Sequence, residues 1–240
     1  MKRALLLICT VAITFSVSAQ GGFLNKAKEK LAKASGGSTS SLSTEEIVAG
    51  LREALTVGAT NSSGKLSAAD GFFKDAAVKI LMPEEVQKVE KKMRMLGMGK
   101  IVDNTILSMN RAAEDASKSA ANIFITAIRN MSISDALGIL RGQDTAATSY
   151  LRGATNAQLT AAFRPVIEAS LQKVEATKYW KDFFTAYNKV SSEPVNTDLT
   201  SYVTERAMKG IFHYVAEEEK KIRKDPAARV NDILKKVFAN

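Results

Sequence analysis

The segment from residue 99 to residue 131 contains the polar side chains best placed for chemistry. Projected as a helix, it shows an apolar stripe and, opposite to it, a polar stripe. Asp103, Asn110 and Glu114 fall on neither stripe and share a flank with aliphatic residues, with Arg111 at its edge. Because buried charges need partners, we expect polar groups from other helices to meet this flank. The candidate partners are Lys79, Asp135, Asp144 and Arg223.

This polar flank is compatible with three roles. A buried polar network can fix the register of packed helices without binding anything. The same residues can form a ligand site in which Arg111 pairs with a carboxylate or phosphate. An enzyme that uses Glu114 and Asp144 as acid and base also needs a cleft and a shifted carboxylate pKa. We favour a non-catalytic role and assign no catalytic residue. The candidate ligand-binding residues are Lys79, Asn110, Arg111, Glu114, Asp144 and Arg223.

The composition argues against metal and cofactor chemistry. The 240 residues include one Cys and one His, which excludes Cys-based zinc sites and multi-histidine metal sites. The lone His213 stands four residues before Glu217, a spacing typical of a pair on one helix face. No Gly-rich segment has the spacing of a phosphate-binding loop. We therefore expect no cofactor and no metal.

Three methionines within six residues form the remaining candidate for metal chemistry. Met93, Met95 and Met98 supply thioethers of the kind that bind Cu(I). Packing is the favoured interpretation, since Met fills irregular apolar gaps. On that interpretation Met93 and Leu96 fill the core, while Met95 and Met98 cover the end of a helix.

The N-terminal residues predict export. Two basic residues precede an almost continuous apolar run over residues 4–17, and small residues follow up to Ala19. This pattern is typical of a secretory signal peptide cleaved after Ala19. The run is too short for a membrane anchor, which takes about 20 residues. We expect a periplasmic or secreted protein, and its only thiol, Cys9, would leave with the signal peptide.

Residues 20–41 predict a tether between the signal peptide and the main domain. Phe23 to Ala34 has the pattern of a short Lys-rich amphipathic helix, and residues 35–41 contain only Gly, Ser, Thr. Such a helix can make weak contact with an anionic membrane surface. The formal net charge of the whole chain is +9. Since the main domain interleaves Lys with Glu and the chain has an export signal, we expect no nucleic-acid partner.

Residues 42–240 predict one all-α domain, a bundle of several helices. Ser43 to Glu46 has the sequence of a capping box, and the apolar spacing after it is helical nearly everywhere. No stretch alternates with period two between turn signals, as a strand would. The predicted core stripe of the longest helix consists of Val102, Ile106, Met109, Ala113, Ala116, Ala120, Phe124 and Ala127.

Capping and breaking residues predict the helix boundaries. The first helix should end between Asn61 and Gly64, and one helix should run from Gly99 to Met131. Pro165 should kink or break a helix that opens at Thr155. Further helix starts are predicted at Pro83, at Ser132 or Ser134, and at Asp144, Lys178, Asp198 and Asp225.

Several short motifs together resemble one protein family. They are Asp70-Gly71-Phe72, Lys79-Ile80 with Pro83, Asn110 to Glu114, Asp135 to Gly142, Asp144 to Thr148 with Tyr150, Tyr202-Val203, Ala216 to Glu219 with Ile222-Arg223, and Leu234 to Phe238. By these motifs the chain is similar to the exported bacterial family known as domain of unknown function 4197, over about Leu42 to Phe238. The resemblance implies a single helical domain of periplasmic type in Gram-negative bacteria. It implies no activity, cofactor or catalytic residue.

Two functions follow as hypotheses. The first is an exported, non-catalytic protein that holds a hydrophobic or amphipathic small molecule between Ala-rich helices, the aromatic segment Tyr179 to Tyr187 and the flank around Arg111. The alternative is a structural or protein-interaction module with a partner protein in the cell envelope. A cavity above about 300 Å³ favours the first hypothesis. A packed interior with an exposed apolar patch favours the second.

Overall fold

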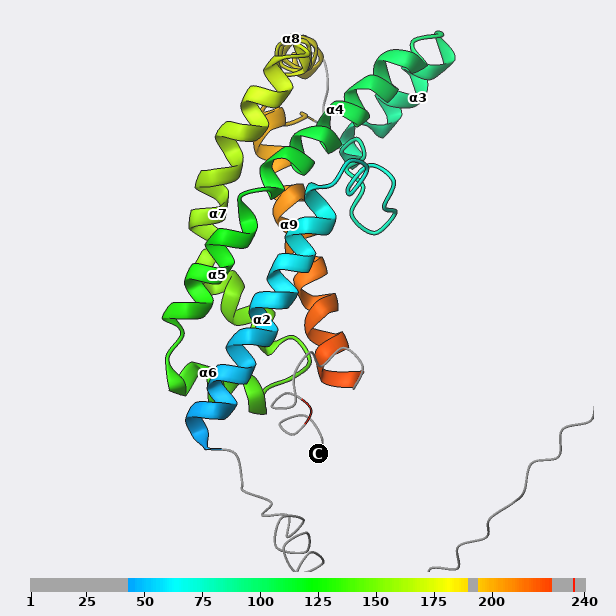
Figure 1. Ribbon diagram of the computed structural model, residues 1–240. Helices are drawn as coiled ribbons and strands as arrows, with labels where there is room; N and C mark the ends of the chain where they lie inside the picture. Colours follow the sequence, from blue (N-terminus) through cyan, green and yellow to red (C-terminus); the bar gives the residue numbers. More distant parts are fainter. Residues whose placement is uncertain (1–42, 190–193, 226–234, 236–240) are drawn as a thin grey trace, which may run out of the picture. The chain divides into compact units, whose positions relative to one another are not determined.

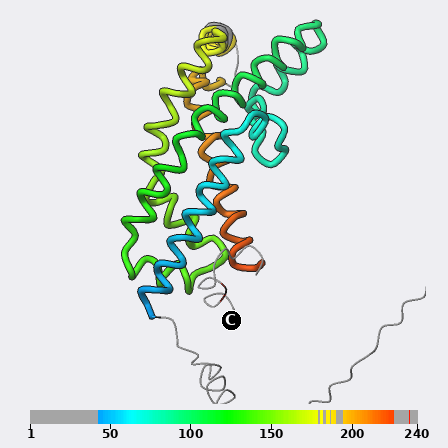
Figure 2. The backbone as a smooth tube through the Cα atoms, viewed as in Figure 1, coloured from blue at the N-terminus to red at the C-terminus, as the bar shows by residue number. Residues whose placement is uncertain are grey.

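The structure of the protein, a computed structural model, describes residues 43–189, 194–225 and 235 (Figures 1 and 2). The chain divides into Met1–Ser41 and Leu42–Asn240, and all described residues belong to the second unit. These residues form α-helices and one short 3-10 helix, without a strand, so the all-α prediction is confirmed. The predicted signal peptide, the Phe23 to Ala34 helix, the linker and most of the predicted last helix lie outside the described residues.

Several helices lie alongside one another and form a bundle, and the other helices gather at its two ends (Figure 1). The helices that lie side by side in the bundle are α2 (Thr44–Ser67), α4 (Gly99–Ser117), α5 (Ala120–Asn130), α7 (Ala146–Gln172) and α9 (Leu199–Lys224). At one end lies α6 (Ile133–Arg141). At the other end lie η1 (Glu84–Val86), α3 (Gln87–Met95) and α8 (Ala176–Asn188).

The core follows the stripe predicted for residues 102–127. Seven of its eight residues are buried, and Ala127 is half-buried. On α7 the buried apolar residues recur every four residues from Leu159 to Leu171, as one helix face requires. Phe124 of α5 meets Phe212 of α9 edge to face, with ring centroids 5.6 Å apart. The small Ala side chains of α4 let its neighbours approach closely.

Local capping signals predicted several helix ends correctly. The Ser43 hydroxyl accepts from Glu46 N, and the Glu46 carboxylate accepts from Ser43 N, which completes the capping box of α2. Ser132 and Asp135 form the same reciprocal pair at α6. Asp198 accepts from the backbone N–H of Ser201 and so caps α9. Each of these signals acts over three residues, which is why the sequence alone reveals it.

Two predicted boundaries were wrong because burial or turn geometry outweighed propensity. Helix α2 continues to Ser67 instead of ending between Asn61 and Gly64. Ser62, Ser63 and Leu66 are buried there, so packing keeps the last turns helical. The predicted helix Gly99–Met131 is two helices, α4 and α5. The chain turns at residues 118–119, where Ser119 N and its hydroxyl both bond the Ala116 carbonyl.

The predicted helix start at Thr155 was wrong, since α7 runs unbroken from Ala146 to Gln172. A helix does start close to Asp144, but Thr145 takes the N-cap position that was predicted for Asp144. Thr155 lies inside the helix, buried, and its hydroxyl donates to the Leu151 carbonyl at 2.6 Å. Pro165 lies on the exposed side of the helix, where water can satisfy the carbonyl that loses its N–H donor.

Among the described residues, no single helix is both long and apolar enough to cross a membrane. One broken pair, Gly99–Asn130 with Ile133–Arg141, bent by 105°, reaches that length and composition together.

Candidate functional site

The loop between α2 and η1, residues 68–82, covers the polar flank of α4. The loop starts in a strained turn, since Asp70 has a positive φ of 68°. Gly71 follows in close contact with α2, and a Cβ there would lie 2.4 Å from the Lys65 carbonyl oxygen. Only glycine fits at this approach. The turn directs the next residues, Phe72 and Phe73, toward α4.

Asn110 binds the far end of this loop. Its side-chain oxygen accepts from Ile80 N at 2.8 Å, and its amide nitrogen donates to the Ile80 carbonyl at 2.8 Å. The same nitrogen donates to the Ile106 carbonyl at 2.7 Å. Asn110 is fully buried, and it replaces the backbone partners that Ile80 would find in a sheet. Its polar groups are therefore used to fix the loop.

Glu114 and Arg111 bind the near end of the loop. One Glu114 carboxylate oxygen accepts from Phe72 N at 3.1 Å and from Phe73 N at 3.2 Å. Its other oxygen accepts from Arg111 at 2.6 Å, and Arg111 also pairs with Asp70 at 2.7 Å. Glu114 and then Asp70 raise the pKa of Arg111, while Lys74 and then Arg111 lower the pKa of Asp70. We call Asp70, Asn110, Arg111 and Glu114 the loop lock.

The predicted partners of the flank were wrong, except that Lys79 lies beside it. The Lys79 ammonium is 4.2 Å from the Phe73 ring centroid, and the Arg111 guanidinium is 5.8 Å from the same ring. Asp135 caps α6, while Asp144 and Arg223 have partners elsewhere. The actual partners come from the loop. The sequence did not identify this loop, because apolar spacing shows which helix face is covered and does not show which segment covers it.

Glu219 and Arg223 of α9 form a second lock, at the N-terminus of α7. Glu219 accepts from Ala147 N at 2.9 Å and from Thr148 N at 2.8 Å, so α9 supplies the cap that Thr145 does not. Arg223 donates to Glu219 and to the Ile139 carbonyl at 2.8 Å, which ties in α6. Asp144, predicted as a helix cap, pairs instead with Lys224 at 2.6 Å, and this hydrogen bond lowers the Asp144 pKa.

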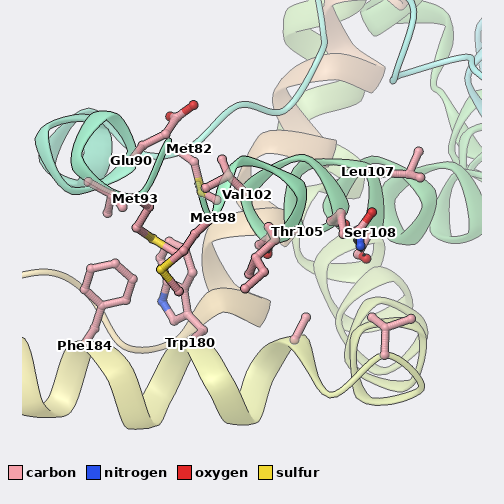
Figure 3. A pocket seen from close by; sticks show the side chains of 15 residues that line it. Met82, Glu90, Met93, Met98, Val102, Thr105, Leu107, Ser108, Trp180 and Phe184 are labelled. Carbon is pink, nitrogen blue, oxygen red and sulfur yellow. Dashed lines mark hydrogen bonds between the residues drawn. The ribbon is translucent and has the colours of Figure 1, made fainter. Parts of the chain in front are cut away.

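An open apolar cavity of about 810 Å³ lies between α3, α4 and α8 (Figure 3). Met93 and Met98 point toward the rings of Trp180 and Phe184, whose centroids are 4.5 Å apart. None of the six predicted ligand-binding residues lines it. The lining consists of Met82, Val86, Glu90, Met93, Met98, Ile101, Val102, Asn104, Thr105, Leu107, Ser108, Val174, Ala176, Trp180 and Phe184.

Most polar groups of this lining are occupied within the protein. The Thr105 and Ser108 hydroxyls donate to the carbonyls of Ile101 and Asn104 at 2.9 and 2.8 Å. Trp180 Nε1 donates to the Asn196 carbonyl at 3.0 Å, which leaves the ring face for apolar contact. Glu90 pairs with Arg94 at 2.9 Å. The cavity therefore offers mainly dispersion contacts and an apolar surface.

The turn from α3 to α4 positions two of the Met side chains that line the cavity, Met93 and Met98. Gly97 has a positive φ of 79°. The backbone N–H of Met98 donates to the Met93 carbonyl at 2.9 Å, and that of Gly97 donates to the Arg94 carbonyl at 3.1 Å. This is a Schellman motif, in which the residues corresponding to Met93 and Met98 commonly touch. The prediction that Leu96 fills the core was wrong, since 77% of its surface is exposed. Met98 is 40% exposed and lines the cavity.

The sequence pointed to only part of this cavity. The predicted aromatic segment contributes Trp180 and Phe184, and Tyr187 packs edge-on against Phe184 with centroids 5.9 Å apart. The side chains of Tyr179 and Phe183 lie outside the described residues. Met82 and Val86 were missed because nothing in the sequence shows that their segment folds against α4. The Met93–Met98 cluster was the available signal. Within the part of the chain that the structure describes, no three His, Cys, Asp or Glu side chains gather to hold a metal ion.

Comparison with protein families gives one match. Residues 41–239 match the family described as a protein of unknown function, DUF4197, so the chain belongs to that family. Comparison with curated proteins and with solved structures finds no match.

Proposed function

We propose that this protein is exported to the periplasm or the outside of the cell and there binds a hydrophobic or amphipathic small molecule without transforming it. The observation that supports the proposal is the apolar cavity of about 810 Å³ between α3, α4 and α8. Ligand pockets range from about 300 to 1,000 Å³ and are mostly apolar. The N-terminal signal pattern is the support for export.

The lining suits a flexible apolar chain attached to a polar group. Met93 and Met98 are adaptable side chains that can follow an irregular chain. Trp180 and Phe184 provide flat faces on the opposite side, as Figure 3 shows. Since the cavity opens to solvent near the exposed Met98 and Ile101, a polar head group would remain in water.

A protein-interaction module of the cell envelope is the second candidate. Its support is the set of exposed apolar side chains next to the cavity, Met95, Leu96, Ile101 and Val174. An enzyme using Glu114 and Asp144 has less support, because neither carboxylate lines the cavity. Glu114 already accepts three hydrogen bonds, and the pKa of Asp144 is lowered, which disfavours it as a general acid.

The first experiment is native mass spectrometry of protein taken from the envelope of the cells that make it. A stoichiometric extra mass that is released by denaturation is expected, and its identity would give the ligand class. A clean mass of the protein alone would favour the interaction module, and chemical crosslinking for partners would follow.

The second experiment uses Trp180, the single Trp of the chain, as a reporter inside the cavity. Titration with long-chain fatty acids should change its fluorescence. Ala176→Phe places a ring in the cavity and should weaken binding about tenfold or more, or about 1.4 kcal/mol. Ala157→Phe adds the same ring at an exposed position of α7 and should leave the affinity unchanged. Equal affinities for both variants would place the ligand outside this cavity.

A further inference from the structure

The turn between α3 and α4 exposes apolar side chains at the end of the molecule. Met95 is 78% exposed, Leu96 77%, Ile101 52% and Met98 40%. These four are among seven large apolar side chains that are exposed in the described part of the chain. Figures 1 and 2 show that α3 and the start of α4 project away from the other helices of the bundle. We call Met95 to Met98 together with Ile101 the hairpin tip.

Basic residues surround this tip. Residues 91–101 contain Lys91, Lys92, Arg94 and Lys100 and no acidic residue. Arg94 pairs with Glu90 of α3 and with Asp103 of α4, at 2.9 and 2.8 Å, and so braces the hairpin. The three Lys side chains are exposed and form no ion pair with any other described residue. The hairpin tip therefore combines an apolar apex with cations at its base.

We infer that the hairpin tip docks onto an anionic phospholipid bilayer. Met95, Leu96 and Met98 would enter the boundary between head groups and acyl chains, as the apolar face of an interfacial helix does. Lys91, Lys92 and Lys100 would reach the lipid phosphates, because long basic side chains extend their charged ends toward the polar layer. This docking is a different activity from ligand binding in the cavity, although Met98 and Ile101 belong to both surfaces, whereas Met95 and Leu96 do not line the cavity.

The positive charge of the hairpin tip favours an anionic lipid surface as its partner over a second copy of the protein or another segment of the same chain. A second copy would bring the same basic residues into contact with these. The Phe23 to Ala34 segment has four Lys and one Glu, so it too would be repelled by the hairpin tip. An anionic bilayer satisfies both the apolar side chains and the cations. The Schellman turn and the Arg94 brace fix the geometry in advance, which reduces the ordering cost of docking.

The test is flotation of the protein, purified from the cells that export it, with two kinds of vesicle. One kind contains equal parts of phosphatidylglycerol and phosphatidylcholine, and the other only phosphatidylcholine. The parent protein should float with the anionic vesicles. The double variant Met95→Gln, Leu96→Gln should partition at least tenfold less. Ile133→Gln removes an apolar side chain that is 48% exposed on α6, and should leave partitioning unchanged.

A charge-matched pair of triple variants tests the basic residues. Lys91→Gln, Lys92→Gln, Lys100→Gln should lose the preference for anionic vesicles. Lys118→Gln, Lys173→Gln, Lys209→Gln changes the net charge equally at exposed sites outside the hairpin and should retain that preference. Similar loss in both triple variants would mean that net charge alone attracts the protein, and would overturn the inference.

A probe at the hairpin tip separates its insertion from membrane contact through residues 23–34. Leu96→Cys labelled with an environment-sensitive nitrobenzoxadiazole dye should shift its emission to the blue on anionic vesicles, and labelled Ile133→Cys should not. Vesicle binding without a shift at residue 96 would assign the contact elsewhere and overturn the inference. The Trp180 titration of the Met95→Gln, Leu96→Gln variant reports on the cavity separately, so either proposal can fail without the other.

Discussion

At the scale of single residues, the polar side chains that were the best candidates for binding or catalysis hold the backbone in place. Glu114 is 4% exposed and accepts from two loop amides and Arg111. Asn110 makes three hydrogen bonds, all to backbone groups. A buried group with every partner supplied stabilises one conformation and leaves little capacity for a ligand. Of the roles considered for this flank, the structural one fits these contacts best.

Arg111→Ala should therefore affect stability more than binding. Without Arg111, the buried Glu114 carboxylate loses the cation that pairs with it among the described residues, and the free energy of unfolding should fall by about 2 kcal/mol. Urea unfolding measures this change. Arg164→Ala removes an exposed pair with Asp198 and should cost less than about 1 kcal/mol. If Arg111→Ala instead keeps its stability and loses fatty-acid binding at Trp180, the loop lock is a ligand site.

At the scale of helices, α7 depends on α9 for its N-terminal cap. The first N–H groups of a helix have no partner within it, and the carboxylate of Glu219 supplies two acceptors. A negative charge at this end also interacts favourably with the helix dipole. Arg223 neutralises Glu219 and is only 11% exposed, so the cap and its counterion form one buried unit.

Glu219→Ala should destabilise the protein strongly. It removes acceptors from Ala147 N and Thr148 N and takes away the Glu219 carboxylate that pairs with Arg223, which should cost about 3 kcal/mol or more. Glu217→Ala breaks a more exposed pair with Lys220 on the same helix and should cost less than about 0.5 kcal/mol. Thermal and urea unfolding compare the two. Equal losses would show that α7 does not need the cap from α9.

At the scale of the whole molecule, Asp75 joins the loop to two helices. Its carboxylate pairs with Lys65 of α2 at 3.1 Å and accepts a hydrogen bond from Tyr214 of α9. Burial by itself would raise the Asp75 pKa, but the hydrogen bonds from Tyr214, Lys65 and Ala77 outweigh it, and the pKa is lowered. Hydrogen bonds and nearby cations likewise lower the pKa values of Asp115 and Asp198.

These lowered pKa values predict acid unfolding. A carboxyl whose pKa is lower in the folded state contributes stability above its unfolded pKa, about 3.9 for Asp. That stability is lost as the pH falls through the lowered folded pKa. Urea unfolding from pH 7 downward should show stability decreasing below about pH 5. Asp75→Asn should be less stable at pH 7 and show a shallower decrease. An unchanged slope would mean that Asp75 does not contribute.

The sequence by itself determined the features that act over a few residues. The caps at Ser43, Ser132 and Asp198, the stop at Gly97 and the core stripe on α4 and α5 follow from spacings of three or four residues. Such interactions depend only on neighbours along the helix, so their residue types identify them directly. The same short motifs identified the family, which the match over residues 41–239 shows.

Only the tertiary structure decided which distant segments meet. Glu114 binds an amide 42 residues away, and Glu219 caps a helix 72 residues away. The continuation of α7 likewise depends on how the helix packs, since Thr155 is buried against its neighbours and Pro165 lies on the exposed side. The cavity combines a loop, two sides of a hairpin and α8. Helical periodicity marks a face as covered, but many segments satisfy the same pattern, and the choice among them is made by packing the whole chain at once.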